Sequence, residues 1–313
     1  MKGTYTLLVF ALLITMIISP LGFLEGETAD NPLPSGGGAF TVKLAGSDET
    51  VRVPYREYVI GVLAGEMSPD TEPEALKAQA VAAYTYALWK QTSRDTLKGY
   101  DVSADPKEDQ CWLSTTEQVA LWQESYDKNR SLLEAAVDEV LGYTVTYGGK
   151  PILAAYHSVS SGKTESAASA WGSDYPYLIN VESAADLLSP EYLSDSVLTT
   201  AQFADKALDL GITLVGEAKN WLGDTERSET GAVISFTLAG KKISGADMRT
   251  AFSLASRNFD LAYADGKFTF TVRGSGHGVG MSQYGAVSMA SEGSNWMDIL
   301  SWYYPGTDIT PPS

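Results

Sequence analysis

The chain has 313 residues, 44% of them hydrophobic, which is enough for a packed core in one large or two modest domains. Its net charge of −17 argues against a nucleic-acid partner, because phosphate binding needs clustered lysines and arginines. A single cysteine excludes an internal disulfide and a cysteine-based zinc cage. The two histidines are too few for most metal sites built from protein ligands alone.

The N-terminus carries the clearest targeting pattern. Lys2 is followed by about twenty uncharged residues, long enough to cross a bilayer. Residues 1–24 therefore predict a transmembrane signal-anchor whose basic end lies in the cytoplasm, and residues 25–40, acidic and rich in Pro and Gly, predict a flexible stalk. A cleaved signal peptide is the alternative. Both interpretations place the folded part outside the cytoplasm.

The folded part begins with two strands and a helix. Alternation around a turn-like AGSDE predicts strands over residues 41–52, and a helix is predicted over Tyr55–Met67. In that helix Glu66 shares a face with Val62 and Leu63. An ionised carboxylate on an apolar face is costly unless it is paired or opens on a cleft. Glu66 is therefore predicted either to have a partner or to serve chemistry.

A second helix is predicted from Pro73 to about residue 90. Thr71 and Glu74 have the spacing of a capping box, and Pro73 suits the first turn. The helix is apolar on nearly all sides, which indicates a buried position at the centre of a domain. Gln79, in the middle of it, is a polar group that needs a partner.

The rest of the chain mixes short helices and strands. We expect one or two surface helices over residues 114–145 and a hairpin around Gly148 and Gly149. Residues from about 189 to 227 are expected to be helical and polar, within an inserted second lobe over about residues 189–230. Two short strands with a turn at Gly240 then precede a helix, and a strand runs into a glycine-dense loop near residue 273. The mixture predicts an α+β fold rather than a regular βαβ alternation.

Three further stretches could carry chemistry: YHSVSSGKTE at 156–165, WGSDYPYL at 171–178 and RGSGHGVGMSQYGA at 273–286. The last matches neither a dinucleotide loop nor a G-x-S-x-G elbow. Its glycines predict close backbone approach or positive φ around His277, which suits a ligand loop and a tight structural turn equally. Trp171, Tyr175 and Tyr177 suit either sugar stacking or a core.

Seven segments together resemble the SpoIID/LytB family of stage II sporulation proteins. They are VPYREYVIGVLAGEM, EALKAQAVAAYTYAL, YHSVSSGKTE, GSDYPYL, ISGADMRTAFSLASRNF, GHGVGMSQYGA and ILSWYYPGT, in the family's order. The resemblance implies a membrane-anchored lytic transglycosylase that cuts peptide-free peptidoglycan glycan strands to 1,6-anhydro-muramic acid products during endospore engulfment. It implies an extracytoplasmic catalytic domain over residues 41–309, with helical and strand lobes that form a substrate cleft. This domain would lie on the mother-cell engulfing membrane and act beside a sporulation amidase and a further membrane protein.

The resemblance also implies the residues that act. Glu66 matches the family's essential acid and is expected to be the single general acid and base, with a pKa raised by its apolar neighbours. The residues expected to bind substrate are Gln79, Tyr84, Ser160, Ser161, Lys163, Thr164, Glu165, Tyr177, His277, Gln283 and Tyr284.

Two positions depart from the family pattern. Tyr84 stands where many relatives carry an arginine. Ser103, Glu108 and Asp109 occupy a stretch in which some relatives hold zinc with a Cys/His cluster, so we expect no metal and no cofactor.

Two other functions fit the same sequence. One is a non-catalytic glycan-binding module that enhances an amidase. The other is a two-carboxylate hydrolase with Asp70 or Glu165 as the second acid.

Overall fold

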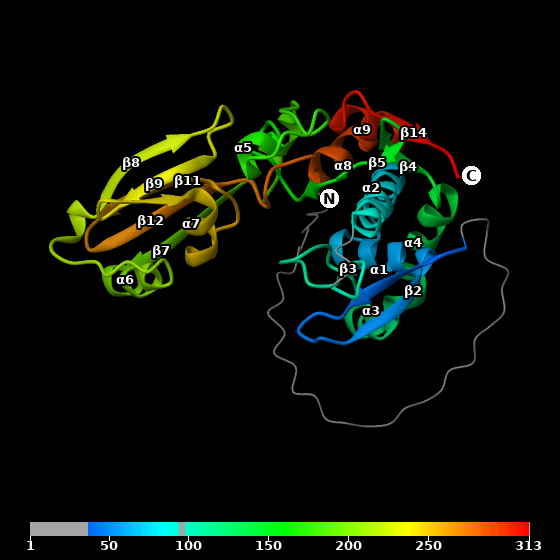
Figure 1. Ribbon diagram of the computed structural model, residues 1–313, viewed down its shortest axis with the longest axis horizontal. Helices are drawn as coiled ribbons and strands as arrows, with labels where there is room; N and C mark the ends of the chain where they lie inside the picture. Colours follow the sequence, from blue (N-terminus) through cyan, green and yellow to red (C-terminus); the bar gives the residue numbers. More distant parts are fainter. Residues whose placement is uncertain (1–36, 94–97, 313) are drawn as a thin grey trace, which may run out of the picture.

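The structure, a computed structural model, describes residues 37–93 and 98–312. The chain forms two lobes joined by a middle segment (Figure 1). One hydrophobic core gathers buried residues from 40–178 and 279–304, and a second gathers residues 203–272. The predicted mixture of helices and strands is confirmed. The expected signal-anchor lies outside the described residues, and none of the helices within them is long and apolar enough to cross a membrane.

The first lobe is built around helix α2. Its helices are α1 (Tyr55–Glu66), α2 (Pro73–Thr92), α3 (Thr115–Trp122), α4 (Tyr126–Val140), α8 (Gln283–Ser291) and α9 (Trp296–Tyr303), with a 3₁₀ turn at Gln123–Ser125. Helix α2 contacts α1, α4, α8 and α9, which confirms its predicted central position (Figure 1).

Small sheets cover the edges of this lobe. Their strands are β1 (Ala39–Lys43), β2 (Thr50–Pro54), β3 (Val102–Ser103), β4 (Thr144–Tyr147), β5 (Lys150–Pro151), β6 (Tyr156–His157), β13 (Met281–Ser282) and β14 (Asp308–Thr310). They pair in the orders β2-β1-β3, β14-β4-β5 and β13-β6. The predicted N-terminal strands and the hairpin at Gly148 are confirmed, and β1 begins slightly before the expected boundary at residue 41.

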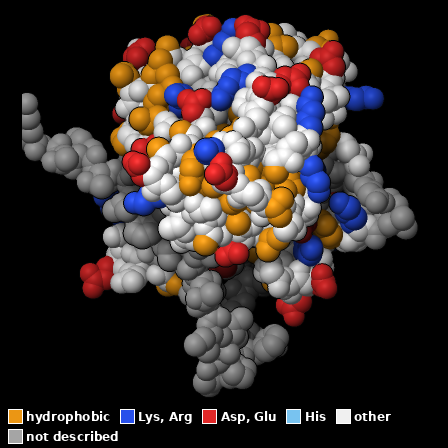
Figure 2. All heavy atoms as spheres, turned by 90° about the vertical axis from the view of Figure 1, so that its left-hand side faces the viewer, with side chains coloured by type: hydrophobic (Ala, Val, Ile, Leu, Met, Phe, Trp, Pro, Cys, Tyr) orange, Lys and Arg blue, Asp and Glu red, His pale blue; other side chains and the backbone are white. Residues whose placement is uncertain are grey.

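The second lobe packs two antiparallel sheets around an aromatic core. Its elements are β7 (Leu193–Thr199), α6 (Thr200–Leu208), a 3₁₀ turn (Ala218–Asn220), β8 (Leu222–Arg227), β9 (Val233–Leu238), β10 (Lys241–Ser244), α7 (Gly245–Phe252), β11 (Asn258–Ala264) and β12 (Lys267–Arg273). The sheets have the orders β10-β9-β8 and β11-β12-β7. The stacked rings of Phe203 and Phe268, 3.9 Å apart, lie in the core. Figure 2, viewed onto this end, shows acidic and basic side chains intermixed with small hydrophobic areas.

The helical character predicted for 189–227 is wrong for most of that segment. Only α6 and the short 3₁₀ turn are helical, because β7 pairs along its whole length with β12 and β8 pairs with β9. The residues that pair with β7 lie up to 80 residues away, at Arg273, so the local sequence pattern gave no indication of this pairing. The second core continues to Val272, well beyond residue 230.

The middle segment brings two of the singled-out stretches together. Strand β6 pairs in parallel with β13, and isolated bridges join Val159 to Ser275 and Glu165 to Val279. The fully buried Asp186 accepts hydrogen bonds from the Ser160 backbone N–H and the Ser282 hydroxyl, both at 2.8 Å. Residues 156–165 and 275–283 therefore form one unit between the lobes.

The capping box predicted at Thr71 and Glu74 is wrong. The N-cap of α2 is Glu72, and no side chain there caps the helix. Glu74 instead accepts hydrogen bonds from the Trp296 backbone N–H at 2.9 Å and from Lys77, so it joins α2 to the start of α9. This long-range contact takes the place of the local cap.

Two buried glutamines should respond oppositely to substitution by methionine, which has a similar volume. Gln79 is 0% exposed, and its amide has no hydrogen-bond partner among the described residues. Gln110 is 3% exposed and bonds Tyr58, Ala83 and Tyr156. We expect Q79M to raise the free energy of unfolding in urea by about 1 kcal/mol and Q110M to lower it by about 2 kcal/mol. Equal destabilisation by both variants would contradict the conclusion that Gln110 is hydrogen-bonded and Gln79 is not.

Candidate active site

Glu66, the last residue of α1, lies half-buried among neutral hydrogen-bonding groups. Its Oε1 accepts from the Cys111 backbone N–H at 2.9 Å, and its Oε2 lies 3.4 Å from the Gln283 amide nitrogen. The Tyr156 hydroxyl also hydrogen-bonds the carboxyl group. Three segments far apart in the sequence therefore meet at this side chain, and none of them brings a cation.

The surroundings favour the protonated form of Glu66. Burial raises the pKa of the carboxyl above its ordinary value of 4.5, while the hydrogen bonds from Cys111 and Gln283 act in the opposite direction, as would a bond donated by Tyr156. Val62 and Leu63, one turn earlier on α1, are 0% exposed. Glu66 also stands at the C-terminal end of its helix, where the negative end of the helix dipole disfavours an anion.

The orientation of Gln110 determines what Tyr156 can offer to Glu66. The Gln110 amide nitrogen lies 3.3 Å from the Ala83 carbonyl, which can only accept, and 2.9 Å from the Tyr58 hydroxyl. Its Oε1 therefore faces Tyr156 and accepts the tyrosine's single hydroxyl proton at 2.8 Å. The Tyr156 oxygen is left as an acceptor toward Glu66, and an acceptor pairs with a carboxyl that carries a proton.

Two glycines let the segment at Cys111 approach α1. A Cβ at Gly65 would lie 2.7 Å from Cys111 Sγ and 2.8 Å from its carbonyl oxygen. A Cβ at Gly61, one turn earlier, would lie 2.3 Å from Trp112 Nε1. Because both positions lack a side chain, residues 111–113 lie directly on the helix, and the Cys111 N–H reaches Glu66.

The glycine-dense loop brings Gln283 to the same place. Gly280 has φ +74°, and a Cβ there would lie 1.9 Å from the Ala155 carbonyl oxygen. This close approach allows β13 to pair with β6 and sets the start of α8 beside Glu66. The predicted positive φ is confirmed at Gly274, Gly276, Gly278 and Gly280.

The two histidines brace this loop. The Val279 backbone donates to His277 Nδ1 at 3.1 Å, and its carbonyl lies 3.1 Å from His157 Nδ1. Burial lowers the pKa of His157 to about 4. Burial, followed by the charges of His157 and nearby arginines, lowers the pKa of His277 to about 3, while its hydrogen bond to the Tyr156 backbone acts in the opposite direction. Both rings are therefore neutral at neutral pH.

Glu165 forms a second polar centre, at the junction of the lobes. Its carboxylate is 4% exposed and accepts from Arg257 at 3.3 Å and from Ser169 at 3.1 Å. Ser228 and Thr230, between β8 and β9, donate to its other oxygen. These bonds tie the second lobe to the middle segment and occupy both carboxylate oxygens.

Comparisons with known proteins agree with the resemblance of the seven segments. The model of a family described as stage II sporulation protein matches residues 45–147. A stage II sporulation protein D of Bacillus amyloliquefaciens is 38% identical over 82% of this chain and 74% of its own length. A Bacillus subtilis (strain 168) protein of the same name is 36% identical over 91% of this chain and 85% of its own length. The chain belongs to the stage II sporulation protein D family.

A more distant relative carries a different name. A Bacillus subtilis (strain 168) protein named amidase enhancer is 27% identical over 80% of this chain and 40% of its own length. Its name describes an effect on another enzyme.

The structure gathers five of the residues expected to bind substrate around one crevice. These five are Ser160, Ser161, Lys163, Glu165 and His277. Arg257, Asn258 and Arg273 also line the crevice. Ser160 Oγ accepts from the Gly162 N–H, and Lys163 pairs with Glu229 at 3.1 Å. Gln283 lies apart from this group, on Glu66 itself.

The other expected binding residues lie in different settings. Gln79 and Thr164 are 0% exposed, and Thr164 bonds the backbone of Ile179. The Tyr84 ring packs on Tyr55 at 5.4 Å, in an aromatic cluster of the first core, and burial raises its pKa to about 12. The Tyr177 hydroxyl accepts from the Leu153 N–H at 3.1 Å, and Tyr284 is half-buried at the start of α8.

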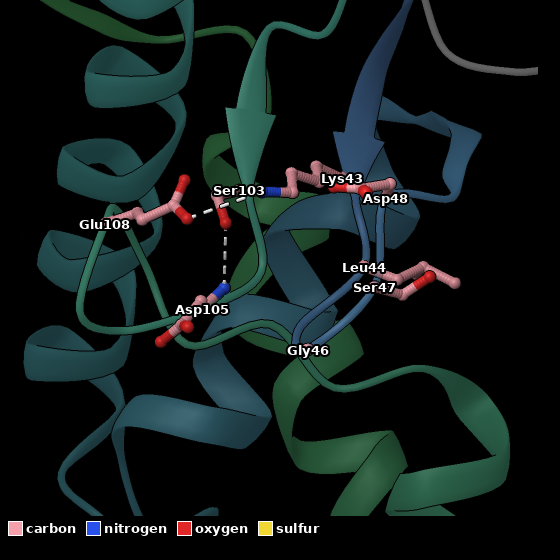
Figure 3. Close-up of a pocket in the computed structure, with 8 residues that line it drawn as sticks. All are labelled: Lys43, Leu44, Gly46, Ser47, Asp48, Ser103, Asp105 and Glu108. Atoms are coloured by element: carbon pink, nitrogen blue, oxygen red, sulfur yellow. Dashed lines mark hydrogen bonds and ion pairs between the residues drawn. The ribbon is translucent and has the colours of Figure 1, made fainter.

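A cavity of about 260 Å³ in the first lobe is lined by none of the residues expected to act or to bind substrate (Figure 3). It lies between the turn after β1 and the loop after β3, and Lys43 and Glu108 pair across it at 3.5 Å. The Asp105 N–H donates to Ser103 Oγ at 3.2 Å. Other lining groups bond residues outside the cavity, such as Ser47 with the Glu49 N–H and Asp105 with the Lys107 N–H. Among the residues that the structure describes, no group of three His, Cys, Asp or Glu is placed to hold a metal ion.

Three residues of the site were not recognised from the sequence. Tyr156 lies within a quoted stretch, but an aromatic residue after an apolar run is indistinguishable from a core residue. Cys111 acts through its backbone N–H, which leaves no trace in the side chain. Gln110 precedes it in a stretch without periodicity, and only its three partners reveal its role.

We expect G65A to destabilise the protein, although alanine favours a helix by up to about 1 kcal/mol over glycine. The added methyl group would displace Cys111, so overpacking should lower the free energy of unfolding by about 1–3 kcal/mol. Urea denaturation measures the change. Helix propensity alone predicts that G65A is more stable than the wild type. That result would show that the approach of Cys111 does not require a glycine at position 65.

A second prediction concerns acid stability. The unfolded chain protonates His157 near pH 6.5, and the folded protein only near pH 4, so the unfolded state binds more protons between these values. His157 should therefore cost up to about 3 kcal/mol of stability as the pH falls through this window. Unfolding free energies of wild type and H157N, measured from pH 7.5 to 4, should converge as the pH falls. A constant difference would show that His157 is not buried in its neutral form.

Proposed function

We propose that the protein is a lytic transglycosylase that cleaves peptide-free peptidoglycan glycan strands, with Glu66 as the single general acid and base. The observation that carries the proposal is the half-buried Glu66 carboxyl, whose pKa is raised by burial and whose described hydrogen-bond partners are all neutral. Family membership supports the same substrate class.

The mechanism needs one carboxyl group that changes role. Protonated Glu66 donates its proton to the glycosidic oxygen as the bond to the anomeric carbon breaks. The 6-hydroxyl of the same muramic acid then attacks that carbon and gives its proton to the Glu66 carboxylate. The products are a 1,6-anhydro end and a free hydroxyl on the leaving sugar, and the acid is restored. No water needs activation, so no second carboxylate is required.

The two other acids considered from the sequence are poor candidates for a second catalytic carboxylate. Both oxygens of Glu165 are occupied by Arg257, Ser169 and the loop of the second lobe. Asp70 is exposed to solvent and accepts a hydrogen bond from Ser68. These settings support a one-acid mechanism over a two-carboxylate hydrolase.

The proposal includes the place of action and the partners. A signal-anchor over residues 1–24 would hold the catalytic domain on the outer side of the mother-cell engulfing membrane. A sporulation amidase would remove stem peptides and so supply the peptide-free strands, beside a further membrane protein of the engulfment machinery. The relative named amidase enhancer supports a link to an amidase.

We expect E66Q to lose glycan cleavage by about 10²–10⁴-fold, because the amide keeps the shape of the side chain but has no proton to donate. The substrate is purified peptide-free glycan, and the readout is the amount of 1,6-anhydro-muramic acid ends. D70N is the matched control and should cleave at the wild-type rate.

The products also separate the alternatives. Reducing ends from the wild type would indicate a hydrolase, and loss of activity in D70N would indicate a second carboxylate. Glycan binding without new ends would favour the amidase-enhancing module. Cleavage by E66Q close to the wild-type rate would exclude Glu66 from the chemistry.

A further inference from the structure

Trp171 differs from the aromatic residues around it in its exposure. It is 42% exposed, whereas Tyr177, six residues later, is 6% exposed and its hydroxyl is bonded to the backbone. The structure thus separates the two uses that this aromatic stretch could have. Tyr177 belongs to the core, whereas Trp171 is partly exposed to solvent.

The position of Trp171 is well defined despite its exposure. It ends the short helix α5 (Ala167–Trp171), which Ser166 caps through the Ser169 N–H at 3.2 Å and Gly172 ends in the left-handed conformation. Ala167, at the start of α5, is 0% exposed and bonds the Leu178 carbonyl. A rigid aromatic surface can bind a ligand with little loss of conformational entropy.

Trp171 is also connected to the acid. Its ring meets that of His277 in a T-shaped contact, with centroids 5.3 Å apart at 62°. His277 in turn hydrogen-bonds the Tyr156 backbone, and the Tyr156 hydroxyl bonds Glu66. Only two residues therefore intervene between the exposed indole and the proposed proton donor.

We propose that Trp171 binds a sugar ring of the glycan strand, an N-acetylated hexopyranose near the bond that Glu66 cleaves. This inference rests on the proposed function. The C–H groups on one face of a pyranose form an apolar surface that stacks on an indole, and the indole N–H can donate to a hydroxyl or acetamido oxygen. Trp171 thereby sets the position of the strand relative to Glu66.

Trp302 provides a matched control. It is 49% exposed, on α9, but its indole N–H donates to the Glu182 carbonyl at 2.9 Å. It makes no ring contact with the histidines among the described residues. The two tryptophans thus have similar exposure and different connections to Glu66.

The test measures binding separately from turnover. Peptide-free glycan fragments of defined length are titrated calorimetrically into E66Q, E66Q/W171A, E66Q/W171F and E66Q/W302A. W171A should weaken binding about tenfold or more, while W171F, which keeps a ring, and W302A should stay within about threefold of E66Q. In an otherwise wild-type protein, W171A should raise KM and change kcat little. Thermal unfolding checks that each variant is folded.

The outcomes distinguish this inference from the proposed function. Unchanged binding by E66Q/W171A, equal weakening by W302A, or no glycan binding by E66Q would each overturn the role of Trp171. If binding depends on Trp171 but the wild type forms no anhydro ends, the sugar site stands and the proposed catalysis fails. If anhydro ends form and W171A binds normally, catalysis stands and the sugar site fails.

Discussion

The site depends on keeping one carboxyl group out of bulk water without giving it a positive partner. Glu66 ends α1, where the helix dipole disfavours a negative charge. Its described partners are a backbone N–H, an amide and a tyrosine hydroxyl. A salt bridge would lower the pKa of such a group and fix it as a carboxylate. Glu165, by contrast, is paired with Arg257 at 3.3 Å, so the chain places one glutamate beside a cation and the other among neutral groups.

Close backbone approach creates the environment of Glu66. Gly61 and Gly65 admit the segment at Cys111 on one side of the carboxyl, and Gly280 admits the turn that leads to Gln283 on the other. These glycines come from opposite ends of the chain, and both sets lack a Cβ where another backbone passes. The neutral surroundings of Glu66 thus depend on packing throughout the first lobe.

Elements with a strong local signal could be predicted from the sequence. Periodicity and Pro73 were enough for α1 and α2, and the glycine pattern near His277 was enough to predict positive φ. Strand β7 was missed because its pairing with β12 is not local, and the cap at Thr71 failed because Glu74 bonds to α9 instead. In the site, Glu66 was conspicuous as an acid on an apolar face. The contact of Cys111 with Glu66 could not be predicted, because it uses the backbone N–H, which nearly every residue type carries.

The central claim concerns the proton on Glu66, and a titration of that carboxyl tests it directly. In protein labelled with ¹³C at glutamate side-chain carboxyls, the Glu66 resonance can be assigned as the signal missing from E66Q. The account predicts a titration midpoint above the ordinary value of 4.5, since burial outweighs the hydrogen bonds to the carboxylate. A midpoint at or below 4.5 would show a solvated or ion-paired acid and contradict the account.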